Sequence, residues 1–147
     1  MTEQQKELLL TDISARLRYG VKCSYYDKCV DEQDEGTITG MQNGTYFVID
    51  GVCIDVENVR PYLFPISSMT EEQMNELEEL CDIYSPDDDY RPYAYLGIKV
   101  LYKHVLDDGY KFNFKRNVID WFNKKHLDYR GLIEMGLADD ATGKNIY

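Results

Sequence analysis

The 147-residue sequence contains no apolar run long enough to cross a bilayer, and its first seven residues lack the basic start and apolar core of a signal peptide. It also lacks the phosphate-binding loop of nucleotide hydrolases, the Gly-x-Ser-x-Gly turn of common serine esterases and the His-Glu-x-x-His pair of zinc peptidases. We therefore expect a cytoplasmic protein that does not use these chemistries, with no cofactor and no membrane partner.

Metal-binding patterns are scarce as well. No two cysteines have Cys-x-x-Cys spacing, and the two histidines, His104 and His126, are not spaced as ligands with each other or with a cysteine. The four cysteines lie in or beside segments expected to be core, which predicts reduced, buried thiols and no metal site; they are Cys23, Cys29, Cys53 and Cys81.

The central part of the chain has the pattern of a small antiparallel sheet. Asn43 and Gly44 separate two segments rich in β-branched and aromatic residues, 37–42 and 45–50, which predicts a hairpin with a two-residue type I′ turn. Residues 21–25 and 52–56 alternate in the same way. Because closure removes exposed edges, four short strands predict a strongly bent antiparallel sheet or a partly open β-barrel.

Helix signals flank this β section. Thr2 with Gln5, and Thr70 with Gln73, have the spacing of capping boxes, which predicts helices over residues 2–17 and 71–84. A third helix is expected over residues 115–125 and a short fourth one over 128–136, capped by Asp128 and ended by Gly136, so that the two form a helical corner.

The predicted fold is thus a single α+β domain over residues 1–147. A breaker at residues 85–89 separates a first part, 1–84, from a mainly helical second part, 85–147. Residues 95–106 fit a helix or a strand, and the helix is favoured.

Tyrosine is abundant, with 13 residues against one tryptophan. Tyrosines provide a large amphipathic contact area at low entropic cost, so an excess is typical of recognition surfaces, although it also fits ordinary packing. The candidates for a protein-binding site are Tyr25, Tyr26, Tyr46, Tyr62, Tyr90, Tyr93 and Tyr95.

Two alternatives to a protein-binding module remain open. The net charge of -11 opposes nucleic-acid binding in general, but Lys124, Lys125 and Arg130 could contact phosphates. His126 is followed two positions later by Asp128, a pairing that could tune a catalytic base in a nonstandard pocket. No catalytic residue is assigned on this basis.

Residues 58–73 and 120–138 resemble signature segments of small uncharacterised proteins carried by phages and mobile elements of gut anaerobes. The resemblance implies a bacterial or phage setting and carries no catalytic residues. Together with the missing catalytic motifs and the tyrosine excess, it leads us to expect a non-enzymatic accessory module that binds a protein partner.

Overall fold

The computed structural model describes the backbone of residues 1–84 and 112–147 and the side chains of residues 1–80 and 116–147. Several features named above lie outside the described residues. They are the expected breaker at residues 85–89, the segment 95–106 that fits a helix or a strand, Tyr90, Tyr93, Tyr95 and His104. The elements are α1 (Glu3–Arg16), a 3₁₀ turn (Leu17–Tyr19), β1 (Val21–Asp27), β2 (Glu32–Gln42), β3 (Tyr46–Ile49), β4 (Val52–Asp55), a 3₁₀ turn (Val56–Asn58), β5 (Val59–Pro65), a 3₁₀ turn (Ile66–Ser68), α2 (Glu71–Tyr84), α5 (Phe112–Lys124), β6 (Leu127–Asp128) and β7 (Asp139–Asp140).

One mixed, open sheet organises the described part of the chain. Its strands follow the order β4-β3-β2-β1-β5-β6, and β7 also pairs with β5. The first five strands are antiparallel, whereas the short strands β6 and β7 are parallel to β5. The α+β class is therefore confirmed, and the antiparallel strands are joined by two parallel additions that the sequence pattern did not predict.

The predicted hairpin forms at its predicted turn. Asn43 and Gly44 have φ values of 53° and 65°, as a type I′ turn requires, and the amide of Thr45 donates to the carbonyl of Gln42 at 3.2 Å. A second pair with positive φ, Asp50 and Gly51, connects β3 to β4.

The two capping boxes are confirmed as well. The Thr2 hydroxyl accepts from the Gln5 amide, and the Gln5 side chain accepts from the Thr2 amide. Thr70 and Gln73 make the same reciprocal pair at the start of α2. Each box satisfies amides that the first helical turn would otherwise leave unpaired, which fixes where the two helices begin.

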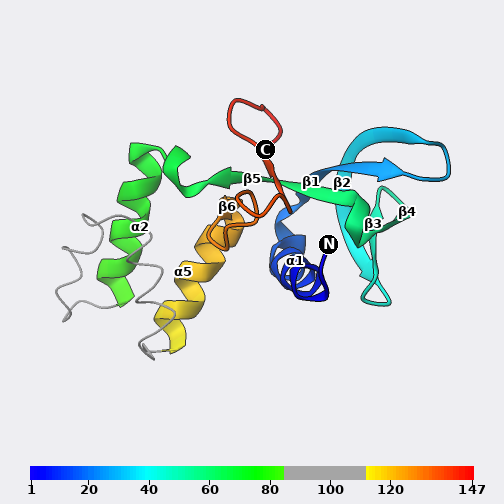
Figure 1. The fold of residues 1–147 in the computed structure, drawn as a ribbon. Coiled ribbons are helices and arrows are strands. Elements are labelled where there is room, and N and C mark those ends of the chain that lie inside the picture. Colours follow the sequence, from blue (N-terminus) through cyan, green and yellow to red (C-terminus); the bar gives the residue numbers. More distant parts are fainter. Residues whose placement is uncertain (85–111) are drawn as a thin grey trace.

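Two hydrophobic clusters share β5. In the first, α1 packs on the sheet, and Leu9 and Ile13 are buried with strand residues such as Leu63. In the second, α2 and α5 lie side by side and bury Leu77 and Phe122 (Figure 1). Phe64, the residue after Leu63, packs against this second cluster, so β5 contributes to both.

A buried ion pair in α1 holds the helices together. The Arg16 guanidinium contacts both carboxylate oxygens of Asp12, at 2.7 and 3.0 Å, and both side chains are fully buried. Arg16 also donates to the carbonyl of Leu127 in β6 at 2.9 Å, and Arg130 Nε lies 3.1 Å from Asp12 Oδ1. The Tyr129 ring lies 5.1 Å from the guanidinium carbon of each arginine. These contacts connect α1 to the segment that follows α5.

The predicted helix over residues 128–136 is wrong, and so is the helical corner. Asp128 belongs to β6, and its carboxylate accepts from the amides of Leu132 (2.9 Å) and Ile133 (2.8 Å). Gly131 and Gly136, with φ values of 75° and 67°, bracket a single turn. The two expected end signals are therefore present, but left-handed glycines at both ends leave room for one turn only.

Candidate functional site

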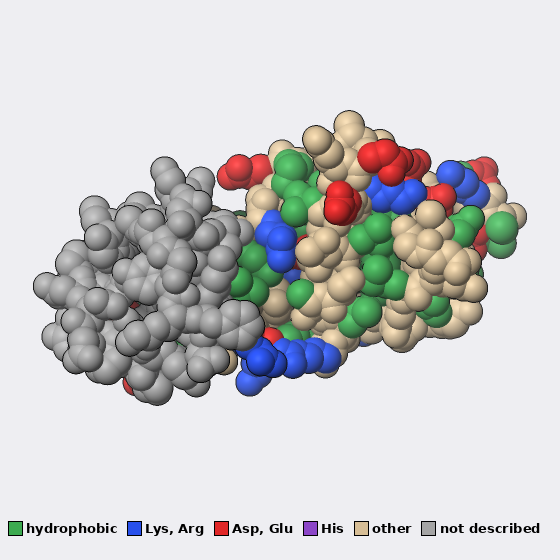
Figure 2. All heavy atoms as spheres, turned by 90° about the horizontal axis from the view of Figure 1, so that it is seen from below, with side chains coloured by type: hydrophobic (Ala, Val, Ile, Leu, Met, Phe, Trp, Pro, Cys, Tyr) green, Lys and Arg blue, Asp and Glu red, His purple; other side chains and the backbone are tan. Residues whose placement is uncertain are grey.

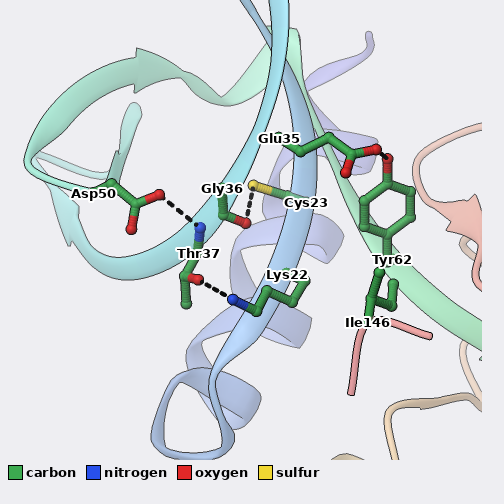
Figure 3. Close-up of a pocket in the computed structure, with 8 residues that line it drawn as sticks. All are labelled: Lys22, Cys23, Glu35, Gly36, Thr37, Asp50, Tyr62 and Ile146. Atoms are coloured by element: carbon green, nitrogen blue, oxygen red, sulfur yellow. Dashed lines mark hydrogen bonds between the residues drawn. The ribbon is translucent and has the colours of Figure 1, made fainter. Parts of the chain in front are cut away.

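Two hollows open beside the β1–β2 hairpin. We call the larger one, of about 460 Å³, the Gly36 hollow; it is lined by Lys22, Cys23, Glu35, Gly36, Thr37, Asp50, Tyr62 and Ile146 (Figure 3). We call the smaller one, of about 260 Å³, the tyrosine hollow; it is lined by Ser24, Tyr25, Tyr26, Gln33, Glu57, Asn58 and Arg60.

The missing side chain of Gly36 shapes the larger hollow. A Cβ atom at this position would lie 2.5 Å from Ile49 Cγ2 and 2.6 Å from Asp50 Oδ2. Without it, the Asp50 carboxylate approaches β2 and accepts from the Thr37 amide at 3.1 Å. The Asp50 amide in turn donates to the Thr37 carbonyl at 3.3 Å. The β3–β4 turn is thus fixed against β2 as one wall of the hollow.

Paired polar groups surround the mouth of the Gly36 hollow. Lys22 Nζ donates to Thr37 Oγ1 at 2.8 Å on one side, and the Tyr62 hydroxyl donates to Glu35 at 2.5 Å on the other (Figure 3). The ammonium of Lys144 lies 4.0 Å from the centroid of the Tyr62 ring and 3.8 Å from Glu35 Oε1. Tyr62 and Glu35 therefore already hold one cation of this chain.

Carboxylates give the region around the Gly36 hollow a negative electrostatic potential. Burial, together with the nearby Asp50 and Glu35 carboxylates, raises the pKa of the Cys23 thiol to about 12. Burial also raises the pKa of Tyr25, with further contributions from Asp34 and Asp50. A thiol that stays protonated is a poor nucleophile, so Cys23 contributes packing and not reactivity.

The structure brings only some of the candidate tyrosines together. Tyr25 and Tyr26 share the tyrosine hollow, where Tyr26 is 39% exposed and hydrogen-bonds to Asp31. Tyr62 is buried and lines the Gly36 hollow. Tyr46 is 40% exposed on β3 but lines neither of the two hollows.

The ring of His126 is buried beside Tyr147. The two rings stack at a centroid distance of 3.7 Å with an interplanar angle of 12°. Burial, together with the positive charge of Arg16, lowers the pKa of His126 to about 4. Both carboxylate oxygens of the expected partner, Asp128, accept from backbone amides. Within the described part of the chain, Nδ1 of His126 has no hydrogen-bond partner.

Two of the three candidate phosphate-binding residues are engaged within the chain. Lys125 Nζ lies 2.6 Å from Glu76, and Arg130 lies against buried Asp12, whereas Lys124 is exposed. Figure 2 shows the face seen from below, on which acidic and basic side chains are interspersed with apolar ones. No extended basic surface therefore covers the described part of this face.

The expectation for the cysteines is only partly met. Cys23 is buried, but Cys29 and Cys53 are exposed, because one lies in the turn after β1 and the other on the edge strand β4; the side chain of Cys81 lies outside the described residues. Among the residues that the structure describes, no three His, Cys, Asp or Glu side chains are grouped as metal ligands, and no helix is long and apolar enough to span a membrane.

Sequence reasoning did not select Glu35, Asp50 or Lys144. The pairs Glu35-Gly36 and Asp50-Gly51 gave a partial signal, since a glycine beside a carboxylate marks a close backbone approach or a turn. Lys144 gave none, because its contact depends on the path of the chain after β7.

Comparisons with family models, curated proteins and solved structures found no match to this chain.

Proposed function

We propose that the protein is a non-enzymatic module that binds a cationic segment of a partner protein on the surface formed by the Gly36 hollow and the tyrosine hollow. The observation that carries this proposal is the composition of that surface, in which aromatic rings and carboxylates surround two adjacent hollows. Between residues 21 and 65, eight carboxylates accompany three basic side chains.

Such a surface suits lysine and arginine side chains. A cation over a tyrosine ring gains about 0.5–1 kcal/mol at an exposed site, and hydrogen bonds between cations and carboxylates are about twice as strong as neutral ones. Long-range attraction to the acidic surface would also accelerate encounter with a basic partner. Tyr26, exposed beside Tyr25, provides ring area that is available without rearrangement.

The reactive side chains near this surface do not favour catalysis. The Cys23 thiol is held protonated by its surroundings, and the buried ring of His126 is stacked on Tyr147 with its pKa lowered to about 4. Neither group has an acid or base partner placed for proton transfer within the described residues, which supports a binding role over an enzymatic one.

We also propose an accessory role in a phage or mobile-element setting, which is the expectation drawn from residues 58–73 and 120–138, and in which the module would modulate a host or phage protein complex. We place it in the cytoplasm. Exposed thiols such as Cys29 and Cys53 stay reduced in that compartment.

The test is a titration of the ¹⁵N-labelled protein with a peptide of alternating lysine and glycine that is acetylated at its N-terminus only. Binding is monitored by the amide chemical shifts of the protein. We expect shifts at the residues that line the two hollows, weakening as salt is added. Tyr26→Ala should reduce affinity about 2- to 5-fold, the loss of one exposed cation–π contact.

Tyr46→Ala is the matched control, since Tyr46 has the same exposure but lines neither hollow. Equal effects of the two substitutions, or shifts located elsewhere, would contradict the proposal. Binding of a DNA duplex that disappears in Lys124→Glu would favour the nucleic-acid alternative instead.

A further inference from the structure

Lys144 occupies a position that a partner's lysine could take. Its ammonium lies 4.0 Å from the Tyr62 ring centroid and 3.8 Å from Glu35, and the Tyr62 hydroxyl is bound to the same carboxylate oxygen. An aromatic face together with a carboxylate is a complete recognition site for an alkylammonium group. The chain itself therefore shows which kind of group this site accepts.

The contact with Lys144 is weak enough to be exchanged. Its side chain is 42% exposed and that of Glu35 is 63% exposed, so water screens the ion pair. Tyr62, in contrast, is 3% exposed and fixed in place by the sheet. The rigid part of the site thus belongs to β5, and the exchangeable part belongs to Lys144.

Lys144 lies on an exposed loop that is held at both ends. Before it, the Ala141 amide donates to the Leu63 carbonyl at 2.8 Å. After it, the Tyr147 hydroxyl accepts from the Lys22 amide at 3.1 Å and donates to the Tyr62 carbonyl at 2.8 Å, and the ring stacks on His126. Residues 142–145 between these anchors are exposed, so Lys144 can leave the Tyr62 ring while both anchors stay in place.

We propose that Tyr62 and Glu35, at the mouth of the Gly36 hollow, form a lysine-recognition site that Lys144 occupies in the free protein and that a lysine side chain of the partner takes over on binding. This proposal rests on the proposed function and identifies one anchor point of the partner. Lys144 acts as an internal competitor that lowers the apparent affinity for any incoming lysine by the same factor.

The hollow has room for the aliphatic part of the incoming side chain. Its volume of about 460 Å³ extends from Tyr62 and Ile146 to Cys23 and Gly36. Acetylation of the partner's lysine removes the charge that both Tyr62 and Glu35 recognise, so an acetyllysine peptide should not compete.

The experiment measures binding of the peptide acetyl-Gly-Gly-Lys-Gly-Gly-amide by calorimetry and by the NMR signals of the Lys144 side chain. Lys144→Ala removes the competitor and should tighten binding about 2- to 5-fold, the value of an exposed ion pair. Lys124→Ala removes the same charge from an exposed position of α5 and should not tighten it. Glu35→Gln should weaken binding both in the wild-type protein and in Lys144→Ala.

The Lys144 side chain provides a second readout that does not depend on a variant folding correctly. Its ammonium lies over the Tyr62 ring. We therefore expect the signals of the adjoining methylene protons to be shifted upfield in the free protein and to return toward ordinary values as the peptide is added. The acetyllysine peptide should leave them unchanged.

The outcomes separate the two proposals. Tyr26-dependent binding with unchanged Lys144 signals, or with no gain in Lys144→Ala, overturns the lysine site and leaves the proposed function standing. Failure of the alternating lysine peptide and of the single-lysine peptide to bind the wild type or Lys144→Ala overturns both.

Discussion

Neutralising Asp12 tests the arrangement on which the packing of α1 depends. Asp12→Asn keeps the shape of the side chain but removes the negative charge between Arg16 and Arg130. The Arg16 side chain is fully buried, so its charge would be left without a counterion in a region that water does not reach. Breaking a buried pair in this way costs about 3–5 kcal/mol, because the remaining charge is not solvated.

The assay is urea unfolding followed by far-UV circular dichroism, with the free energy of unfolding taken at constant denaturant slope. The double variant Asp12→Asn with Arg16→Met should be more stable than the sum of the single effects by at least about 1 kcal/mol, since it removes the stranded cation. An Asp12→Asn loss below about 1 kcal/mol would refute the reasoning.

An exposed pair in the same region provides the control. Arg18 and Asp120 form an ion pair with side chains that are 62% and 40% exposed. Arg18→Ala should change the free energy of unfolding by less than about 1 kcal/mol, because solvent screens this pair.

Two further predictions concern Gly36 and His126. Gly36→Ala should destabilise the protein by about 1–3 kcal/mol, because its Cβ would lie 2.5 Å from Ile49 Cγ2. The control Gly40→Ala should be tolerated far better, because its Cβ would lie 3.8 Å from the nearest atoms of Val48. Equal losses of stability in thermal melts of the two variants would contradict this explanation. The pKa of His126 is about 4 in the folded protein against 6.5 for the free side chain, so the unfolded state takes up a proton first as the pH falls. The free energy of unfolding should therefore fall by about 3 kcal/mol as the pH is lowered from 6.5 to 4. Urea titrations across this range should show a smaller fall in His126→Asn, a variant chosen because asparagine accepts the positive φ of 53° at this position. The same fall in the free energy of unfolding in His126→Asn would contradict the attribution of this pH dependence to His126.

Local signals in the sequence predicted the elements that local chemistry determines. The boxes at Thr2 and Thr70 and the turn at Asn43 depend on residues at most three positions apart, and all three form as expected. The third helix was expected over residues 115–125, and the structure places α5 at Phe112–Lys124.

Contacts distant in sequence account for what the patterns missed. Asp12 and Arg16, four residues apart on α1, have the spacing of a solvent-exposed helix pair. Residues more than a hundred positions later, among them Leu127, Tyr129 and Arg130, contact this pair in the folded protein. Asp128 and Gly136 have the signals of helix ends, but pairing of β6 with β5 takes Asp128 into the sheet.

The candidate site was predicted in part. Of the candidate tyrosines that the structure describes, Tyr25, Tyr26 and Tyr62 line the two hollows and Tyr46 lines neither, while their binding of a partner stays a prediction. The carboxylates that give the surface its charge could not be selected, because the register of β2 against β3 and the missing side chain at Gly36 decide which of the many acidic residues converge.

The shared strand has a consequence for how the molecule loses its structure. Val59 and Leu63 lie within one apolar cluster, while Phe64 packs against the other. Unfolding of β5 would therefore remove packing contacts from both clusters at once. Heat or denaturant should therefore melt the sheet and the α2–α5 pair in a single transition, and a substitution in either region should lower the midpoint of both.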